Sequence, residues 1–230
     1  MRRIPLSTNE FDQMLKEQVV LSRGLRSFVA LNEKDNQIIK MFALGNKKSF
    51  WRQYISPISN RFMKNARRLA ELNVQTIQPC AWYRCKGYQY DVIVYPQCAG
   101  TSIYDLVEKN HDVAPVLEKL ARYIAELHQR KIYFRAGHGG NYLYTGDEKF
   151  SLIDVDNTRF SINLRRRAKN IVYIYQHSKE SKIECFAAYP FSEFVETYFS
   201  VAKLKKKQEQ KVRFWIEQYL AAFEKKQRAS

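Results

Sequence analysis

Between residues 131 and 154 the chain reads KIYFRAGHGGNYLYTGDEKFSLID, and His138, Asn141 and Asp154 in this stretch could perform chemistry together. Amide and carboxylate oxygens are ligands that Mg²⁺ prefers. The ion also keeps several of its waters, so Asn141 and Asp154 suffice as its protein ligands. A neutral imidazole with a pKa of about 6.5 can abstract a proton near neutral pH, which makes His138 a candidate base. Taken singly, Asn141 could instead cap a turn, Asp154 could end a strand, and His138 could hydrogen-bond the loop backbone.

Three of the chain's eight glycines, Gly137, Gly139 and Gly140, surround His138. Glycine has no Cβ, so a glycine-rich backbone and a neighbouring imidazole can come close to another molecule. We therefore expect these glycines to shape a loop beside a phosphate group, with His138 and Asn141 facing it.

The elements that must position this loop follow from the hydrophobic pattern. Alternation between residues 18 and 42 predicts three strands, and residues 77–97 predict two more. Residues 59–73 predict a helix that begins at Ser59 or Asn60. From residue 101 onward amphipathic helices dominate, interrupted by a hairpin over residues 141–156.

This order of elements is that of an α+β, two-lobed, protein-kinase-like fold. We expect a small antiparallel-sheet N-lobe with one helix over residues 1–97, and a mainly helical C-lobe with the hairpin over residues 98–230. Together they would form one kinase-like domain. In kinase-like enzymes a loop that leaves a helix carries the catalytic residue and a metal-binding Asn, and an Asp after the following hairpin binds Mg²⁺. Asn141 and Asp154 occur in that order.

The motifs resemble two groups of kinases. FRAGHGGN, residues 134–141, resembles the HGDLHPGN loop of bacterial small-molecule kinases, including aminoglycoside and choline phosphotransferases, with His138, Gly140 and Asn141 on its later His, Gly and Asn. More closely, IAELHQRKIYFRAGHGGNYLY, FSLIDVDNTRF and LRRRAKNI resemble the lipopolysaccharide core kinases, also labelled toluene-tolerance or InaA-like. The resemblance covers roughly residues 20–180. It implies phosphorylation of inner-core heptose or Kdo at the cytoplasmic side of the inner membrane.

The resemblance also implies ATP and Mg²⁺ as cofactors, with Asn141 and Asp154 as metal ligands. In the N-lobe it implies that Lys40 binds nucleotide phosphates. The remaining residues that we assign to the nucleotide lie in the expected phosphate-covering loop and near the connector; they are Ser22, Arg23, Gly24, Tyr95 and Gln97.

The chain departs from the resembled loop at two positions. Ala136 stands where the catalytic Asp is expected, and Phe134 stands in place of the preceding His. Loss of a general base lowers the rate on the order of 10²–10⁴-fold. Phosphoryl transfer depends mainly on positioning and electrostatics, so such a site can remain a slow kinase. His138 is the candidate replacement base, and the alternative is a pseudokinase that binds nucleotide or regulates without turnover.

The acidic partner of Lys40 is not evident from the sequence. The predicted helix offers Asn65 at the expected register and Glu71 a turn and a half later.

The net charge of +16 is concentrated in segments such as NLRRRAKN and KLKKKQEQKVR. Clustered basic charge favours an anionic partner. We expect a lipopolysaccharide core acceptor and peripheral, electrostatic association with the anionic inner-membrane surface. No nucleic acid is expected, because no DNA- or RNA-binding motif occurs.

The N-terminus lacks the apolar run of a signal peptide, and no apolar run is long enough to span a bilayer, so we expect a cytoplasmic protein. The four cysteines form no CxxC pair and are expected to be reduced thiols rather than zinc ligands.

Overall fold

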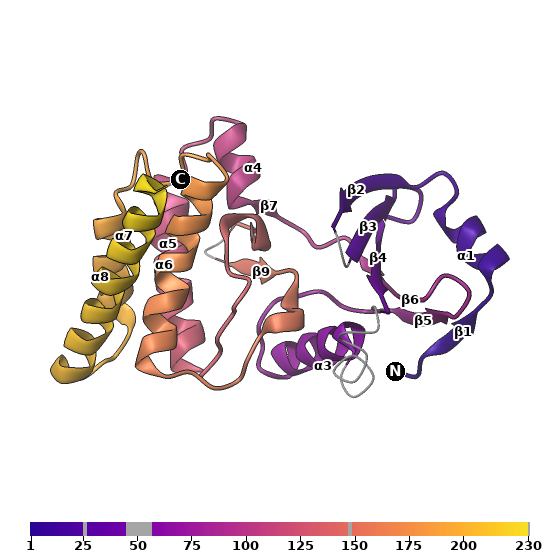
Figure 1. Cartoon of the computed structure of the whole chain (residues 1–230), viewed down its shortest axis with the longest axis horizontal. Helices are drawn as coiled ribbons and strands as arrows, with labels where there is room; N and C mark the ends of the chain where they lie inside the picture. The colour runs from indigo at the N-terminus through magenta and orange to yellow at the C-terminus, as the bar shows by residue number, and fades with distance from the viewer. Residues whose placement is uncertain (25–26, 45–56, 147–148, 230) are drawn as a thin grey trace. The chain divides into compact units, whose positions relative to one another are not determined.

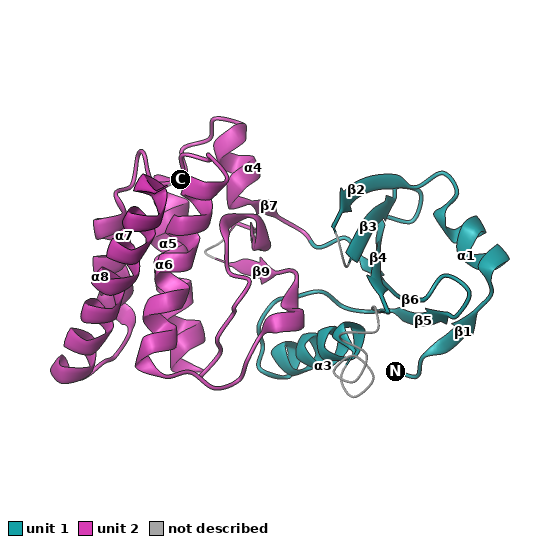
Figure 2. Cartoon of the chain, viewed as in Figure 1, with its two compact units in different colours: residues 1–98 teal, residues 99–230 magenta. Residues whose placement is uncertain are grey.

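The computed structural model describes residues 1–24, 27–44, 57–146 and 149–229 (Figure 1). The chain divides into two compact units, Met1–Cys98 and Ala99–Ser230, which Figure 2 shows in different colours. Residues 1–98 are unit 1, and residues 99–230 are unit 2.

Unit 1 is built on a six-stranded sheet with the strand order β1-β5-β6-β4-β3-β2. Its elements are β1 (Ile4–Leu6), α1 (Thr8–Leu15), β2 (Val19–Arg23), β3 (Ser27–Asn32), β4 (Gln37–Ala43), α3 (Ile58–Glu71), β5 (Ala81–Cys85) and β6 (Tyr90–Pro96). The three strands and the later pair expected from the alternation are therefore present, with the helix between them. In this part of the chain the prediction of an α+β fold is confirmed.

The start of unit 1 corrects the expectation of a purely antiparallel sheet. Strand β1 pairs with β5 in parallel, and helix α1 follows it. Ser7 and Glu10 cap α1 reciprocally, and Phe11 on this helix is buried against Ile39 and Met41. A strand of three residues is too short to show alternation, which is why the sequence pattern did not reveal it.

Helix α3 buries Phe62, Ala66 and Leu69, as its pattern predicts. Its start was predicted wrongly: Pro57 is the N-terminal cap, and neither Ser59 nor Asn60 caps the helix. The hydroxyl of Ser59 instead donates to the carboxylate of Asp91, which is fully buried. Burying a carboxylate without hydrogen-bond donors is costly, so the hydroxyl of Ser59 bonds Asp91 rather than capping the helix.

Unit 2 is mainly helical and contains a three-stranded sheet with the order β7-β8-β9. Its elements are β7 (Thr101–Ser102), α4 (Ile103–Glu108), α5 (Ala114–Gln129), the short 3₁₀ helix η2 (Gly139–Asn141), β8 (Tyr142–Tyr144), β9 (Phe150–Leu152), η3 (Val155–Asn157), α6 (Leu164–Glu180), α7 (Phe191–Val201) and α8 (Lys206–Arg228). Helix α5 packs along α7, and α6 packs along α8 (Figure 1). Within the described ranges, no helix is long and apolar enough to cross a membrane.

The core of unit 2 is fixed by a buried polar contact at the end of α5. His128 is fully buried, and its ring nitrogens contact the hydroxyl of Tyr198 at 2.9 Å and Oδ1 of Asn170 at 3.0 Å. Burial is the main cause that lowers the pKa of His128, to about 3, so the ring stays neutral. The amide of Asn170 also donates to the carbonyl of Phe134 at 2.9 Å, which ties α6 to the loop after α5.

Candidate functional site

The loop that follows α5 is held at its start by backbone hydrogen bonds. At its start, Tyr133 and Arg159 exchange backbone N–H···O bonds of 2.8 and 3.0 Å. This bridge attaches the segment after β9 to the loop after α5. The two segments of chain that carry the predicted site residues are thereby brought together.

The register of the β8–β9 hairpin places Asn141 beside Asp154. Tyr142 pairs with Leu152 in the ladder, and the backbone N–H of Ile153 donates to the carbonyl of Asn141 at 3.2 Å. Asn141 thus lies opposite the residue that immediately precedes Asp154. Residues 147 and 148, between β8 and β9 in the sequence, lie outside the described residues.

Asp154 adopts the left-handed backbone conformation, with φ of 58° and ψ of 49°. Asp and Asn are enriched in this region, which other non-glycine residues adopt less readily. The conformation ends β9 and begins η3, so the chain turns at Asp154.

The side chain of Asn141 is held by its amide nitrogen. Nδ2 donates to the carbonyl oxygen of Ala136 at 2.8 Å and lies 2.9 Å from Nε2 of His138. Asn141 is only 7% exposed. Among the described residues no hydrogen-bond partner contacts its Oδ1, an amide oxygen of the kind that hard cations bind.

Both ring nitrogens of His138 contact the loop itself. Nε2 faces the amide of Asn141, and Nδ1 lies 3.2 Å from the backbone nitrogen of Gly140. Burial is the main cause that lowers the pKa of His138 to about 4, and the nearby His177 lowers it further. The negative charge of the Asp154 carboxylate acts in the opposite direction and raises the pKa of His138.

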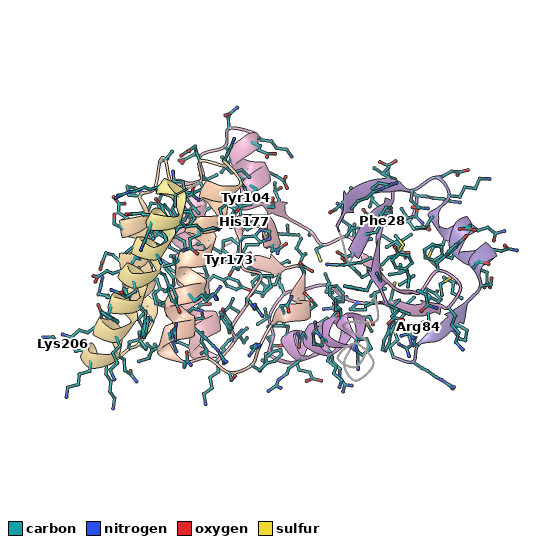
Figure 3. The ribbon with its side chains drawn as sticks, in the orientation of Figure 1. Phe28, Arg84, Tyr104, Tyr173, His177 and Lys206 are labelled. Carbon is teal, nitrogen blue, oxygen red and sulfur yellow. The ribbon has the colours of Figure 1, made fainter. Side chains whose placement is uncertain are left out.

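A stack of aromatic rings covers His138, and the sequence did not reveal it. The rings of His138 and His177 are parallel within 8°, with centroids 4.0 Å apart. The ring centroid of Tyr104 on α4 lies 5.9 Å from that of His138 and 5.8 Å from that of His177, and its hydroxyl contacts Nδ1 of His177 at 2.8 Å. Figure 3 labels Tyr104, His177 and Tyr173, the last of which meets His138 edge-on at 6.3 Å. The only sequence signal was helical spacing of aromatic residues, which is also typical of an ordinary core.

The glycines of the loop are explained by this packing. A Cβ on Gly139 would overlap the ring of Tyr104, and a Cβ on Gly137 would lie 2.5 Å from the hydroxyl of Tyr142. None of the three loop glycines has a positive φ. Close approach of tyrosine side chains, rather than unusual backbone geometry, therefore requires glycine at positions 137 and 139.

Phe134 and Ala136 occupy the positions where the resembled loop carries His and Asp. Phe134 is fully buried, and its ring meets that of Tyr142 edge-on at 5.3 Å. Ala136 is partly exposed, and its carbonyl oxygen receives the Asn141 amide. The backbone of the loop is thus organised around Asn141, while the position of the expected base has no ionisable side chain.

In unit 1, Lys40 lies on the central strand β4 and is 6% exposed. Its Nζ lies 5.1 Å from the ring centroid of Phe62 and 5.5 Å from that of Phe42. Glu71, considered as a partner for this lysine, forms an exposed ion pair with Arg67 at 2.9 Å.

The other unit 1 residues assigned to the nucleotide differ in exposure. Ser22 and Arg23 end the exposed edge strand β2, and the backbone N–H of Gly24 donates to the carbonyl of Ser27 at 2.8 Å. Tyr95 is buried, with its ring 5.9 Å from that of Phe62 on α3.

Gln97 is exposed at the end of unit 1, where its backbone N–H donates to the carbonyl of Asn36 at 2.9 Å.

The donor set of unit 2 suits a hard cation better than zinc. Among the described residues, no group of three or more His, Cys, Asp or Glu side chains could hold a metal ion. Asn141 and Asp154 instead offer an amide oxygen and a carboxylate, which fit Mg²⁺ because this ion retains several waters.

Comparisons with known proteins agree on the fold. No protein-family model matches the sequence, and no curated protein matches it. A high-resolution crystal structure of WbdD matches with a TM-score of 0.54 at 13% identity, covering 88% of this chain and 50% of that chain. The chain has a kinase-like fold.

Two further WbdD structures give the same result. One, of WbdD with the kinase inhibitor LY294002, matches with a TM-score of 0.52 at 13% identity, over 86% of this chain and 49% of that one. Another, described as the bifunctional kinase-methyltransferase WbdD, matches with a TM-score of 0.51 at 13% identity, over 84% and 47%. The kinase-like chain thus spans about half the length of the WbdD chains that it matches.

Proposed function

We propose that this chain is a kinase-like phosphotransferase that transfers the γ-phosphate of ATP to a sugar hydroxyl of the lipopolysaccharide inner core. The observation that supports the proposal is the hairpin register, which pairs the backbone of Asn141 with the residue immediately before Asp154. The kinase-like fold and the resemblance of residues 131–154 to the core-kinase loop support it.

Asn141 and Asp154 would hold Mg²⁺. When bound, the ion would neutralise negative charge on the nucleotide phosphates. The chain's own contribution is to fix these two ligands in advance. The Ala136 carbonyl accepts a hydrogen bond from the amide of Asn141, and the His138 ring lies against the same amide nitrogen. The turn at Asp154 fixes the backbone from which the carboxylate extends.

For unit 1 we propose that Lys40 supplies a cation for the nucleotide phosphates. The side chain lies against the rings of Phe42 and Phe62, which restrict its position. Ser22, Arg23, Gly24, Tyr95 and Gln97 remain candidates for further nucleotide contacts.

We assign His138 a positioning role. Its two ring nitrogens are directed at the amide of Asn141 and at the backbone of Gly140, and burial favours the neutral ring. A ring whose two nitrogens both contact the loop is poorly placed to take a proton from a substrate hydroxyl. In this arrangement it orients the metal ligand Asn141.

A pseudokinase is the second candidate function. It is favoured by Ala136 at the position of the expected base, together with the engagement of both His138 nitrogens by the loop. Such a protein would bind Mg-ATP through the same residues without phosphoryl transfer.

Transfer of labelled γ-phosphate from ATP to purified lipid A–core tests the proposal. Wild-type protein should label the acceptor in a Mg²⁺-dependent manner, whereas Asp154→Asn should not. Binding of Mg-ATP with no labelling of any core acceptor would favour the pseudokinase. Absence of Mg-ATP binding would contradict both candidates.

We further propose that the protein associates with anionic membrane surfaces. Five exposed lysines at the start of α8 and just before it provide a basic surface; they are Lys203, Lys205, Lys206, Lys207 and Lys211. Each basic side chain near an anionic leaflet contributes at most about 1 kcal/mol to the free energy of membrane binding, and salt screens this contribution. Such a surface suits reversible contact with the membrane that contains the proposed acceptor.

A further inference from the structure

A strongly basic cavity lies in unit 2, in addition to the candidate metal ligands. Its volume is about 360 Å³, which is in the range of small-molecule sites. Five of its eight lining residues are cations, and no carboxylate lines it within the described part of the chain. The eight are Tyr133, Arg135, Arg159, Asn163, Arg165, Arg166, Lys169 and Tyr219.

The cations of this cavity have no carboxylate partner in the part of the chain that the structure describes. Among the described residues, no ion pair involves any of the five. Elsewhere in unit 2 arginines readily pair with acids, as Arg213 does with Glu196 and Glu209. Five unpaired cations around one cavity repel one another, and a bound anion would relieve that repulsion.

Two of the arginines are held in place. The Nε of Arg165 donates to the hydroxyl of Tyr219 at 2.9 Å, and its guanidinium lies 4.6 Å from the ring centroid of Trp215. Arg166 donates to the backbone carbonyl and the hydroxyl of Ser161, at 3.4 Å each. A guanidinium fixed in this way loses less conformational freedom when it binds an oxyanion.

The cavity adjoins the candidate site through the backbone. Arg135 immediately precedes Ala136, and the bridge between Tyr133 and Arg159 joins the two segments that carry Asn141 and Asp154. Burial raises the pKa of Tyr173, whose ring meets His138 edge-on, and the charge of Arg135 partly offsets this rise. A molecule in this cavity would therefore lie near the residues proposed for transfer.

We propose that this cavity binds the phosphate group of an already phosphorylated sugar, and that this sugar belongs to the acceptor. The inference rests on the proposed function, since it names the chemistry of the acceptor. Arginine forks match the oxygens of a phosphate, while the hydroxyl of Tyr219 and the amide of Asn163 are suited to sugar hydroxyls. A carboxylate on the sugar would share the same negative charge, so the test includes one.

Calorimetric titration of the full chain at low ionic strength tests the cavity. The probes are glucose 6-phosphate, glucuronate, glucose and inorganic phosphate. We expect glucose 6-phosphate to bind more tightly than the other three. The variant Arg159→Gln/Lys169→Gln should lower this affinity at least about tenfold, because two charge-assisted contacts are lost. The charge-conserving variant Arg159→Lys/Lys169→Arg should retain most of it.

The matched control is Lys109→Gln/Lys225→Gln, which removes the same charge from exposed positions of unit 2 outside the cavity. It should change the affinity less than about twofold. Equal losses in the two Gln variants, or no binding of glucose 6-phosphate, would overturn the cavity assignment. Tighter binding of glucuronate would overturn the choice of phosphate, and equal binding of inorganic phosphate would overturn the choice of sugar.

Binding of Mg-ATP to the same proteins separates this inference from the proposed function. If wild type binds Mg-ATP but not glucose 6-phosphate, the cavity assignment alone fails. If it binds glucose 6-phosphate through Arg159 and Lys169 but not Mg-ATP, the proposed function fails, and with it the assignment of this sugar as acceptor.

Discussion

The side-chain amide of Asn141 donates to the backbone carbonyl of Ala136 at 2.8 Å. The residue that replaces the expected catalytic Asp thus still supports the proposed metal ligand through its backbone. A change of side chain at position 136 leaves this contact intact. The loop can therefore preserve the geometry of a nucleotide site although it lacks the usual base.

Restoring the acid should raise turnover. In Ala136→Asp the new carboxylate would stand where the resembled kinases carry their base, and general-base catalysis contributes on the order of 10²–10⁴-fold. The measurement is phosphate transfer to lipid A–core under saturating Mg-ATP. Ala136→Asn is the control, because it has the same shape without a basic carboxylate and should give no increase. An Ala136→Asp protein no faster than Ala136→Asn would argue against a kinase site at this loop.

The pH dependence of turnover tests the role of His138. Burial holds the pKa of this ring at about 4, so it stays neutral from pH 8 down to about pH 5. The rate should therefore show no loss at about pH 6.5, where an ordinary histidine gains its proton. His138→Gln keeps a polar group near Asn141 and should weaken Mg²⁺-dependent ATP binding more than it lowers kcat. A rate that falls below pH 6.5 in wild type and is about 10²-fold lower in His138→Gln would assign the base role to His138 instead.

Packing in the loop predicts which glycine is hardest to replace. A Cβ on Gly139 overlaps the ring of Tyr104, whereas on Gly140 the nearest atom, in the ring of His138, lies 3.2 Å away. Overpacking of this kind costs about 1–3 kcal/mol. Gly139→Ala should lower the free energy of unfolding by about that amount in urea titrations, and Gly140→Ala by less. Equal effects of the two substitutions would contradict the packing described around Tyr104.

Association with membranes should be electrostatic. Co-sedimentation with anionic vesicles should fall steeply between about 0.01 and 0.15 M salt, because the screening length shortens from about 30 to 8 Å. At the same salt concentration, vesicle binding should be weaker when Gln replaces Lys205, Lys206 and Lys207, since the start of α8 then loses three charges. Binding that is independent of salt, or equal binding to neutral vesicles, would remove this proposal.

The sequence predicted the strands and long helices well because their hydrophobic residues recur with a clear period. Helix α3 shows the limit: its buried face was evident, but its start was not, because the hydroxyl of Ser59 serves a buried carboxylate distant in sequence. Strand β1 was missed for its brevity. The start of α3 and the pairing of β1 both depend on residues distant in sequence. A local hydrophobic pattern cannot predict such contacts.

At the candidate site, the order of Asn141 and Asp154 was visible in the sequence, and the hairpin register explains why they lie together. The stacking of His138 on His177 was not visible, since the two residues belong to elements far apart in the chain. The basic cavity was indicated only in part: NLRRRAKN was noted as a cluster, while Arg135 and Arg159 join it through the backbone bridge.

Mg²⁺-dependent binding of ATP by wild type and by Asp154→Asn tests the central claim most directly. Asparagine tolerates the left-handed backbone at this position and keeps the shape of the side chain, so the fold should be retained and only the negative charge is lost. We predict that wild type binds ATP at least about tenfold more tightly with Mg²⁺ than with EDTA, and that Asp154→Asn shows no such difference. An equal response to Mg²⁺ in the two folded proteins would contradict the account.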